Sequence, residues 1–312
     1  SETRMKAIAT TTIPTVSSER SAFAIWSDLV KARLTFLVLL TTLAGFYAGV
    51  EGAIDWVLLG HALFGTTLVA CGAAALNQWW ERDHDARMPR TETRPLPANE
   101  LLPATVLLAG GILSIGGLLH LALFVNLLTS VLGAITLLSY VLVYTPLKRV
   151  TTLNTAIGAI PGALPPLMGW AAARDSVSRE GWALFAILFF WQLPHFLAIA
   201  WMYREEYAKA GFVMLPVRDP DGARTGRQAV SHTLGLIAVS ICPAVLASGP
   251  SGSPIAGRVY FFGALLFGLA FLWCAIQFSR ELTRARARQL FFASILYLPL
   301  LLGLMALDKV RP

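Results

Sequence analysis

Residues 77–97 read NQWWERDHDARMPRTETRPLP and gather many of the ionisable side chains of a chain of which only 14% is charged. Asn77, Glu81 and Asp85 are four residues apart, so on a helix that continues through residue 85 they would share one face. Three oxygen ligands in a row suit a hard cation, and Mg²⁺ prefers one or two carboxylates together with water and phosphate oxygens. The spacing therefore predicts a magnesium site that is completed by a phosphate-bearing ligand.

Arginines in the same segment supply positive charge for such a ligand. Arg82, Arg90 and Arg94 carry planar guanidinium groups, which can bind phosphate through two hydrogen bonds at once. The pattern G-x-x-x-x-G-K-[ST] does not occur in the sequence, which disfavours ATP hydrolysis. A solvated loop between two helices could hold the same residue types, but the ordered spacing favours a diphosphate that is bound through a metal ion.

Long apolar runs on both sides of this segment indicate the fold class. The chain is 56% hydrophobic, and about 20 apolar residues are enough for a helix to cross the hydrocarbon core of a membrane. We predict an all-α, polytopic membrane protein with nine transmembrane helices around a central cavity. The predicted spans cover residues 32–50, 56–78, 101–123, 126–144, 152–172, 182–203, 229–248, 257–278 and 289–307.

The fifth predicted span is unusual in its composition. It contains Pro161, Pro165 and Pro166 together with several glycines. Breaks in a membrane helix are tolerated only where other protein or a cavity satisfies the released backbone groups. We therefore expect this span to be broken and to line the interior of the bundle rather than to face lipid.

Lysine and arginine are distributed unevenly between the two ends of the predicted spans. If the nine spans alternate in direction, 20 of the 25 lysines and arginines fall on the side of the N-terminus. This bias predicts that the N-terminal side faces the cytoplasm, most simply of a bacterial inner membrane. The net charge of +7 is then explained by topology and anionic ligands, and no nucleic-acid partner is expected. The two longest polar loops, 79–100 and 204–228, fall on this same side.

The remaining segments carry weaker signals. Residues 1–24 are rich in Ser and Thr without periodicity, which predicts a flexible N-terminal tail, and residues 25–312 are predicted to form a single membrane-embedded domain. Cys71, Cys242 and Cys274 lie in apolar runs without paired or metal-ligand spacing. They are interpreted as packing thiols, not as a disulfide framework or a zinc site.

His195 lies deep in the sixth predicted span, three residues after Gln192. An ionisable group inside a membrane is a functional candidate, although a neutral histidine that is bonded to a neighbouring helix is the alternative. Asn154 and Tyr144 allow the same two interpretations, as pocket-lining groups or as hydrogen bonds between helices.

Several of these segments resemble a known family. The segment 77–97 resembles the first aspartate-rich motif of the UbiA superfamily of intramembrane prenyltransferases. YTPLKRVTTLNTAIGAIPGALPPLMGW (144–170), WQLPHFLAIAWMYREEYAKAGFVMLPV (191–217) and DLVKARLTF (28–36) are similar to its haem-modifying branch, the haem farnesyltransferases. The resemblance covers roughly residues 25 to 305. Glu81 stands where an aspartate is usual, and the second loop lacks a D-x-x-x-D motif, as is common in that branch.

The resemblance implies transfer of a farnesyl group from farnesyl diphosphate to the vinyl group of haem B, which gives haem O for terminal oxidases. It implies that Asn77, Glu81, Asp85 and Lys148 form the catalytic set, with Mg²⁺ held by the first three and by Glu206. The side chains expected to bind the diphosphate are Arg33, Arg82, Arg90, Arg94, Tyr144, Arg149 and Arg204. The side chains expected to bind haem are Asn154, Gln192 and His195. The implied partners are the lipid bilayer, haem A synthase and oxidase assembly factors.

Two other functions compete with this one. A prenyltransferase that acts on a quinone precursor such as 4-hydroxybenzoate would carry a complete second aspartate motif, whereas the second loop offers Glu205 and Glu206. A secondary transporter would explain the prolines of the fifth span. It would also need ionisable groups near the middle of the membrane, where the sequence offers few besides His195.

Overall fold

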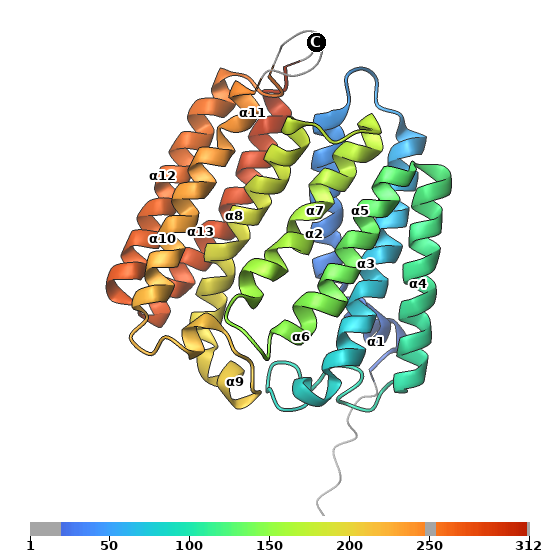
Figure 1. Cartoon of the computed structure of the whole chain (residues 1–312), viewed down its shortest axis with the longest axis vertical. Helices are drawn as coiled ribbons and strands as arrows, with labels where there is room; N and C mark the ends of the chain where they lie inside the picture. Colours follow the sequence, from blue (N-terminus) through green and yellow to red (C-terminus); the bar gives the residue numbers. More distant parts are fainter. Residues whose placement is uncertain (1–19, 247–253, 311–312) are drawn as a thin grey trace, which may run out of the picture.

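A computed structural model describes residues 20–246 and 254–310, which form a bundle of helices (Figure 1). Within these residues nine helical segments are long and apolar enough to cross a membrane. The chain is therefore an integral membrane protein, as predicted. The elements are α1 (Ala22–Leu29), α2 (Ala32–Gly49), α3 (Trp56–Asp85), α4 (Pro103–Phe124), α5 (Leu127–Leu138), the π-helical turn η1 (Ser139–Tyr144), α6 (Thr145–Leu147), α7 (Asn154–Arg174), α8 (Arg179–Met202), α9 (Arg204–Lys209), the 3₁₀ turn η2 (Leu215–Val217), α10 (Ala223–Ser240), α11 (Cys242–Val245), α12 (Arg258–Glu281) and α13 (Arg284–Leu307).

The second span is the helix that matters most for the site. α3 runs for 30 residues from Trp56 to Asp85, so it continues past the apolar run that ends near residue 78. Asp55 begins the helix by accepting hydrogen bonds from the backbone N–H groups of Val57 and Leu58, as an N-cap residue does. The last two turns of α3 therefore carry the polar segment out of the apolar part of the bundle as continuous helix.

α7 lies inside the bundle, and more of it is buried than of any other membrane span in the described residues. This confirms the predicted interior position. The expected break does not occur, because α7 is one continuous helix that includes Pro161, Pro165 and Pro166. The backbones of α7 and α2 approach closely, since a Cβ atom on Gly45 would overlap the Pro166 carbonyl, and one on Gly169 would overlap the Thr42 carbonyl. Packing against α2 thus accommodates the proline-containing segment without a break in the helix.

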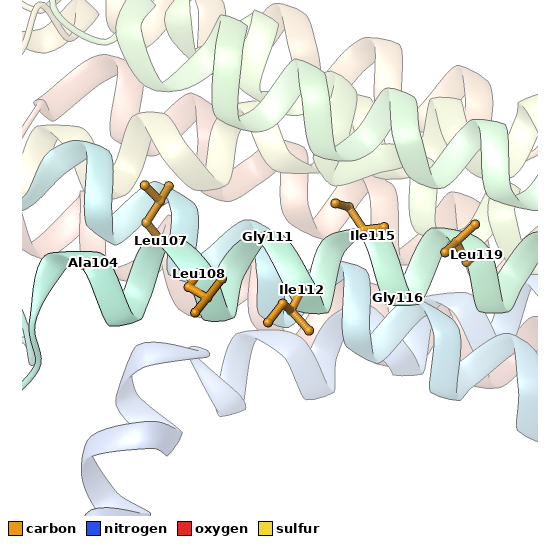
Figure 2. A pocket seen from close by; sticks show the side chains of 8 residues that line it. All are labelled: Ala104, Leu107, Leu108, Gly111, Ile112, Ile115, Gly116 and Leu119. Atoms are coloured by element: carbon orange, nitrogen blue, oxygen red, sulfur yellow. The ribbon is translucent and has the colours of Figure 1, made fainter.

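α4 packs against α3 on one side and turns an apolar face outward. This face carries a groove with a volume of about 650 Å³ (Figure 2). The residues that line it are Ala104, Leu107, Leu108, Gly111, Ile112, Ile115, Gly116 and Leu119. Leu108 and Ile112 are each more than 60% exposed, as expected for side chains that contact lipid. The groove contains no polar group that could take part in chemistry.

The polar loops gather at one end of the bundle (Figure 1), where α1, α6 and α9 also lie. Val213 donates its backbone N–H to the Lys148 carbonyl at 2.7 Å, and Asn154 Nδ2 donates to the Val213 carbonyl at 2.8 Å. Arg90 Nη2 donates to the Tyr207 hydroxyl at 2.9 Å. The loops that follow α3 and α8 are therefore joined to one another and to the turn before α7. Most of the predicted N-terminal tail lies outside the described residues, and helix α1 begins at Ala22.

Candidate active site

Asn77, Glu81 and Asp85 lie on one buried face of α3. Their exposed fractions are 0%, 5% and 3%, although each side chain is polar. Asn77 Nδ2 donates to Glu81 Oε2 at 2.9 Å and to Thr145 Oγ1 at 3.1 Å. Burial of two carboxylates is unfavourable unless opposite charges and hydrogen bonds compensate them. The surroundings of this face should therefore be strongly cationic.

Two cations contact the carboxylates directly. Lys148 Nζ donates to Glu81 Oε1 at 2.9 Å and to Oε2 at 3.1 Å. Arg94 Nη1 donates to Asp85 Oδ2 at 2.6 Å, and Thr91 Oγ1 donates to the Asp85 carbonyl at 2.8 Å. The loop that follows α3 thus folds back so that its own arginine pairs with the last acidic residue of the helix.

A third cation, Lys31, was not selected from the sequence. Its Nζ donates to Asn77 Oδ1 at 2.6 Å and to the Tyr140 hydroxyl at 3.4 Å. Lys31 links α1 to α2 with a φ of 49°, in the left-handed region, which costs a non-glycine residue roughly 1–2 kcal/mol. Such strain persists where the surrounding structure enforces it, and it is frequent at functional sites. The available sequence signal for Lys31 was its position in DLVKARLTF (28–36), a segment that resembles the family.

The cluster changes the protonation of its two lysines. Burial, together with the positive charges of Arg94 and Lys148, lowers the pKa of Lys31 to about 7. Burial alone would also lower the pKa of Lys148, but the Glu81 carboxylate outweighs that effect and raises it above its ordinary value. Lys148 is therefore a permanent cation, whereas Lys31 gains or loses a proton near neutral pH.

A π-helical turn completes this side of the site. Residues Ser139–Tyr144 form the wide turn η1 between α5 and α6, and such turns occur frequently at functional sites. The Tyr140 hydroxyl donates to Asn77 Oδ1 at 3.3 Å. The Lys148 ammonium lies 4.6 Å from the centre of the Tyr144 ring. Tyr140 was not predicted as a site residue. An isolated tyrosine in an apolar run gives no signal of the helical turn that brings it to Asn77.

The donor set fits a metal ion that is shared with a ligand. Within residues 20–246 and 254–310 no group of three His, Cys, Asp or Glu side chains could hold a metal alone. The face of α3 offers two carboxylates and one amide oxygen, which is the partial set that Mg²⁺ accepts when phosphate oxygens and water complete its coordination. Lys31, Lys148 and Arg94 surround the set and could turn toward phosphate oxygens.

In the described residues, no hydrogen bond or ion pair joins the second polar loop to this acidic face. Within the described part of the chain, Glu206 forms no hydrogen bond or ion pair with Asn77, Glu81 or Asp85, and its buried Oε2 has no hydrogen-bond partner. Its role as a metal ligand therefore stays a prediction. Glu205 is exposed.

The other predicted diphosphate ligands lie away from the acidic face. Arg82 Nη1 donates to the Trp79 carbonyl at 2.8 Å, and Arg149 Nη1 lies 3.3 Å from His84 Nε2. The Arg204 guanidinium stacks 4.4 Å above the Trp201 ring. Arg33 is exposed and makes no hydrogen bond or ion pair in the described residues. Of the predicted arginines, only Arg94 contacts the acidic cluster.

Arg90 borders a separate pocket next to Tyr144. The pocket has a volume of about 190 Å³ and lies between the two polar loops and the inner ends of α7 and α8. Its lining residues are Arg90, Tyr144, Thr155, Phe196, Ile199, Tyr207 and Met214. The lining is mostly apolar with one cation, Arg90, and the Tyr144 ring that lines the pocket also lies 4.6 Å from the Lys148 ammonium.

The predicted haem ligands make hydrogen bonds with different parts of the structure. His195 Nδ1 lies 2.7 Å from Ser294 Oγ of α13, and its ring stacks on Trp191 and Phe291 with centroid distances of 5.2 and 5.0 Å. Gln192 Nε2 donates to the Leu188 carbonyl at 2.9 Å. Asn154 Nδ2 donates a hydrogen bond to the Val213 carbonyl of the second loop. No contact brings these three residues together.

Comparison with known proteins assigns this chain to a family. The sequence pattern of the UbiA prenyltransferase family matches residues 38–296. The chain belongs to the UbiA prenyltransferase family. A protohaem IX farnesyltransferase of Solibacter usitatus is 48% identical over 291 residues, which cover 90% of this chain and 97% of that protein. The chain is thus an enzyme of the prenyltransferase class.

Solved structures show the same UbiA prenyltransferase fold. A digeranylgeranylglyceryl phosphate synthase is superimposed with a TM-score of 0.77 at 16% identity, covering 92% of this chain and 98% of that one. A UbiA homologue from Archaeoglobus fulgidus, bound to DMAPP and Mg²⁺, gives a TM-score of 0.65 at 15% identity, with coverage of 90% and 99%. At these identities the likeness concerns the fold alone.

Proposed function

We propose that this chain transfers the farnesyl group of farnesyl diphosphate to a vinyl group of protohaem IX (haem B), which yields haem O. The observation that carries the proposal is the buried Asn77–Glu81–Asp85 face with Lys31, Lys148 and Arg94 around it. The acceptor is suggested by the named activity of the relative from Solibacter usitatus, which aligns over nearly the full length of both chains.

The donor half of the site would bind the diphosphate. Asn77, Glu81 and Asp85 would hold Mg²⁺, which when bound contributes neutralisation of the diphosphate charge. A UbiA homologue from Archaeoglobus fulgidus binds DMAPP together with Mg²⁺, which supports the use of a metal ion with the diphosphate. Lys148 and Lys31 would donate hydrogen bonds to phosphate oxygens as negative charge develops on the leaving group. Preorganised donors of this kind often contribute about 2.7–4 kcal/mol each to catalysis.

The reaction breaks the bond between C1 of the farnesyl group and oxygen, and the electron pair leaves with the diphosphate. The allylic cation that remains is attacked by the π electrons of the vinyl group, which form the new carbon–carbon bond. Water adds to the resulting cation beside the porphyrin and loses a proton, which leaves a hydroxyethylfarnesyl substituent. No strong base is needed to activate the alkene. The Tyr144 ring, which already holds the Lys148 ammonium at 4.6 Å, could stabilise the allylic cation in the same way.

Exclusion of bulk water is the second requirement of this chemistry, because water would also capture the farnesyl cation. The fixed contacts between the two polar loops, including the Arg90–Tyr207 and Asn154–Val213 hydrogen bonds, would close the polar end of the site. The polar end faces the cytoplasm in this proposal. Haem A synthase and oxidase assembly factors would be the proteins that receive the product.

The proposal is tested by product identification in competition. Membranes that contain the protein would receive farnesyl diphosphate, Mg²⁺ and equal amounts of haem B and 4-hydroxybenzoate, and both acceptors would be followed by mass spectrometry. We expect haem O and no farnesylated 4-hydroxybenzoate. Prenylated 4-hydroxybenzoate without haem O would favour the quinone-precursor activity, and neither product, under conditions where a known haem O synthase works, would refute prenyl transfer to haem.

A further inference from the structure

Arg90 is one of the cations of the polar end that no carboxylate neutralises. Lys148 is paired with Glu81 and Arg94 with Asp85. Arg90 has no ion-pair partner in residues 20–246 and 254–310; its Nη2 donates to the Tyr207 hydroxyl at 2.9 Å. Its guanidinium also lies over the Tyr203 and Tyr207 rings, at 5.2 and 5.4 Å from their centres.

These contacts hold the guanidinium in a defined place without cancelling its charge. The stacking on two rings fixes the plane of the group, and one hydrogen bond uses only one of its five N–H donors. Arg90 is exposed and lines a pocket together with Tyr144, Phe196 and Met214. A preorganised, exposed cation on the wall of a mostly apolar pocket is suited to an amphipathic ligand with an anionic edge.

The pocket is separate from the proposed diphosphate position. The diphosphate would lie against Lys31, Lys148 and Arg94, all of which contact residues of the α3 face. In the described residues, the hydrogen bond and the ring contacts of Arg90 are made with Tyr203 and Tyr207, at the start of the second loop. The Tyr144 ring faces Lys148 on one side and also lines the pocket. The Tyr144 ring would therefore border both the donor and the acceptor positions.

We propose that Arg90 binds a propionate carboxylate of the porphyrin acceptor, and that it does not bind the diphosphate as the sequence suggested. This inference rests on the proposed function and deepens it by assigning the acceptor's recognition group. Protohaem carries two propionates along one edge and vinyl groups on the rest of its rim. With the propionates held at the polar end by Arg90, the macrocycle would enter the apolar bundle with its vinyl groups inward.

The size of the pocket agrees with binding of an edge. A volume of about 190 Å³ is below the roughly 300–1,000 Å³ of pockets that enclose a whole drug-sized ligand. It is large enough for the carboxylate-bearing side chains of one edge. The rest of the macrocycle would extend along Phe196 and Ile199 of α8 toward the interior.

The test compares protohaem with its dimethyl ester, in which the carboxylates are masked and the vinyl groups are unchanged. Wild-type protein, Arg90→Gln and Arg87→Gln would be assayed in membranes with farnesyl diphosphate and Mg²⁺. Arg87 is an exposed arginine of the same loop and serves as the matched control. The readouts are KM for each porphyrin and KM for farnesyl diphosphate.

We expect the wild type and Arg87→Gln to prefer the free acid over the ester by about ten-fold or more in kcat/KM, the scale of a lost charge-assisted hydrogen bond. Arg90→Gln should raise KM for protohaem to a similar extent, abolish the preference over the ester and leave KM for farnesyl diphosphate within about two-fold. The inference would be overturned if Arg90→Gln kept the preference for the free acid, or if only KM for farnesyl diphosphate rose. In either case haem O formation would still support the proposed function. Absence of any farnesylated porphyrin with the wild type would instead refute the proposed function itself.

Discussion

Lys148 Nζ lies 2.9 Å from Glu81 Oε1, although the two residues are 67 positions apart in the sequence. Glu81 belongs to α3, and Lys148 follows the short helix α6 behind a π-helical turn. The pair joins the acidic face to the segment that carries Tyr140 and Tyr144. It also shows how the acidic face is compensated before any metal or diphosphate binds.

We expect the double variant Lys148→Met, Glu81→Gln to lose less stability than the sum of the losses in the two single variants. Removal of one partner from a buried ion pair leaves the other charge uncompensated, at a cost of about 3–5 kcal/mol, and the second substitution relieves part of this cost. The measurement is a double-mutant cycle on thermal stability in detergent. Strictly additive effects would show that the two side chains do not interact. Activity should fall by at least 100-fold in both single variants.

Lys31 and Arg33 are two positions apart, and they should differ sharply in function. Lys31 contacts Asn77, whereas Arg33 is exposed. We expect Lys31→Met to lower kcat/KM for farnesyl diphosphate by about 100-fold, the scale of a charged hydrogen bond that strengthens in the transition state, and Arg33→Met to change it less than two-fold. Steady-state kinetics on both variants provides the comparison. An equal loss in the two variants would mean that only the overall charge of the segment matters.

The lowered pKa of Lys31, about 7, predicts a pH dependence of donor binding. Above pH 7 the free protein holds Lys31 neutral, so binding of the anionic diphosphate requires uptake of a proton. Affinity for a non-hydrolysable farnesyl diphosphate analogue should therefore weaken between pH 7 and 9, by at most about ten-fold per pH unit. Lys31→Arg stays charged and should show a nearly flat profile over the same range. Parallel profiles in wild type and Lys31→Arg would exclude Lys31 as the titrating group.

His195 should act on the porphyrin and not on the diphosphate. Ser294 Oγ donates its proton to the Phe291 carbonyl at 2.5 Å, so it accepts from His195 Nδ1 at 2.7 Å, which leaves Nε2 as a bare acceptor. We expect His195→Phe to weaken haem binding by more than ten-fold, observed by absorbance titration, with KM for farnesyl diphosphate unchanged. Ser294→Ala is the control for the hydrogen bond alone. If His195→Phe binds haem normally, the histidine only connects α8 to α13.

Sequence patterns were sufficient for the parts of the molecule that follow from local rules. Apolar run length gave the nine spans, and four-residue spacing gave the shared face of Asn77, Glu81 and Asp85, because both depend only on helix geometry. The continuous helix α7 was not anticipated, since the effect of its prolines depends on how neighbouring helices pack, as α2 does at Pro166.

The cationic half of the site was harder to predict for a similar reason. Arg82, Arg90 and Arg94 are indistinguishable by residue type, yet only Arg94 turns back to Asp85, because the fold of the loop decides the direction of each side chain. Lys31 and Tyr140 reach Asn77 through a left-handed residue and a π-helical turn, and neither feature has a sequence rule. Contacts between distant segments therefore had to come from the structure.

The most direct test of the central assignment is the effect of Asp85→Ala on turnover and on haem binding in the same preparation. Asp85 is 3% exposed and is paired with Arg94 at 2.6 Å, and we assign its carboxylate to the metal that binds the diphosphate. Haem O formation from haem B, farnesyl diphosphate and Mg²⁺ should be abolished, while the haem absorbance titration should match that of the wild type. Near-normal haem O formation by Asp85→Ala would contradict the assignment of the α3 face as the metal–diphosphate site.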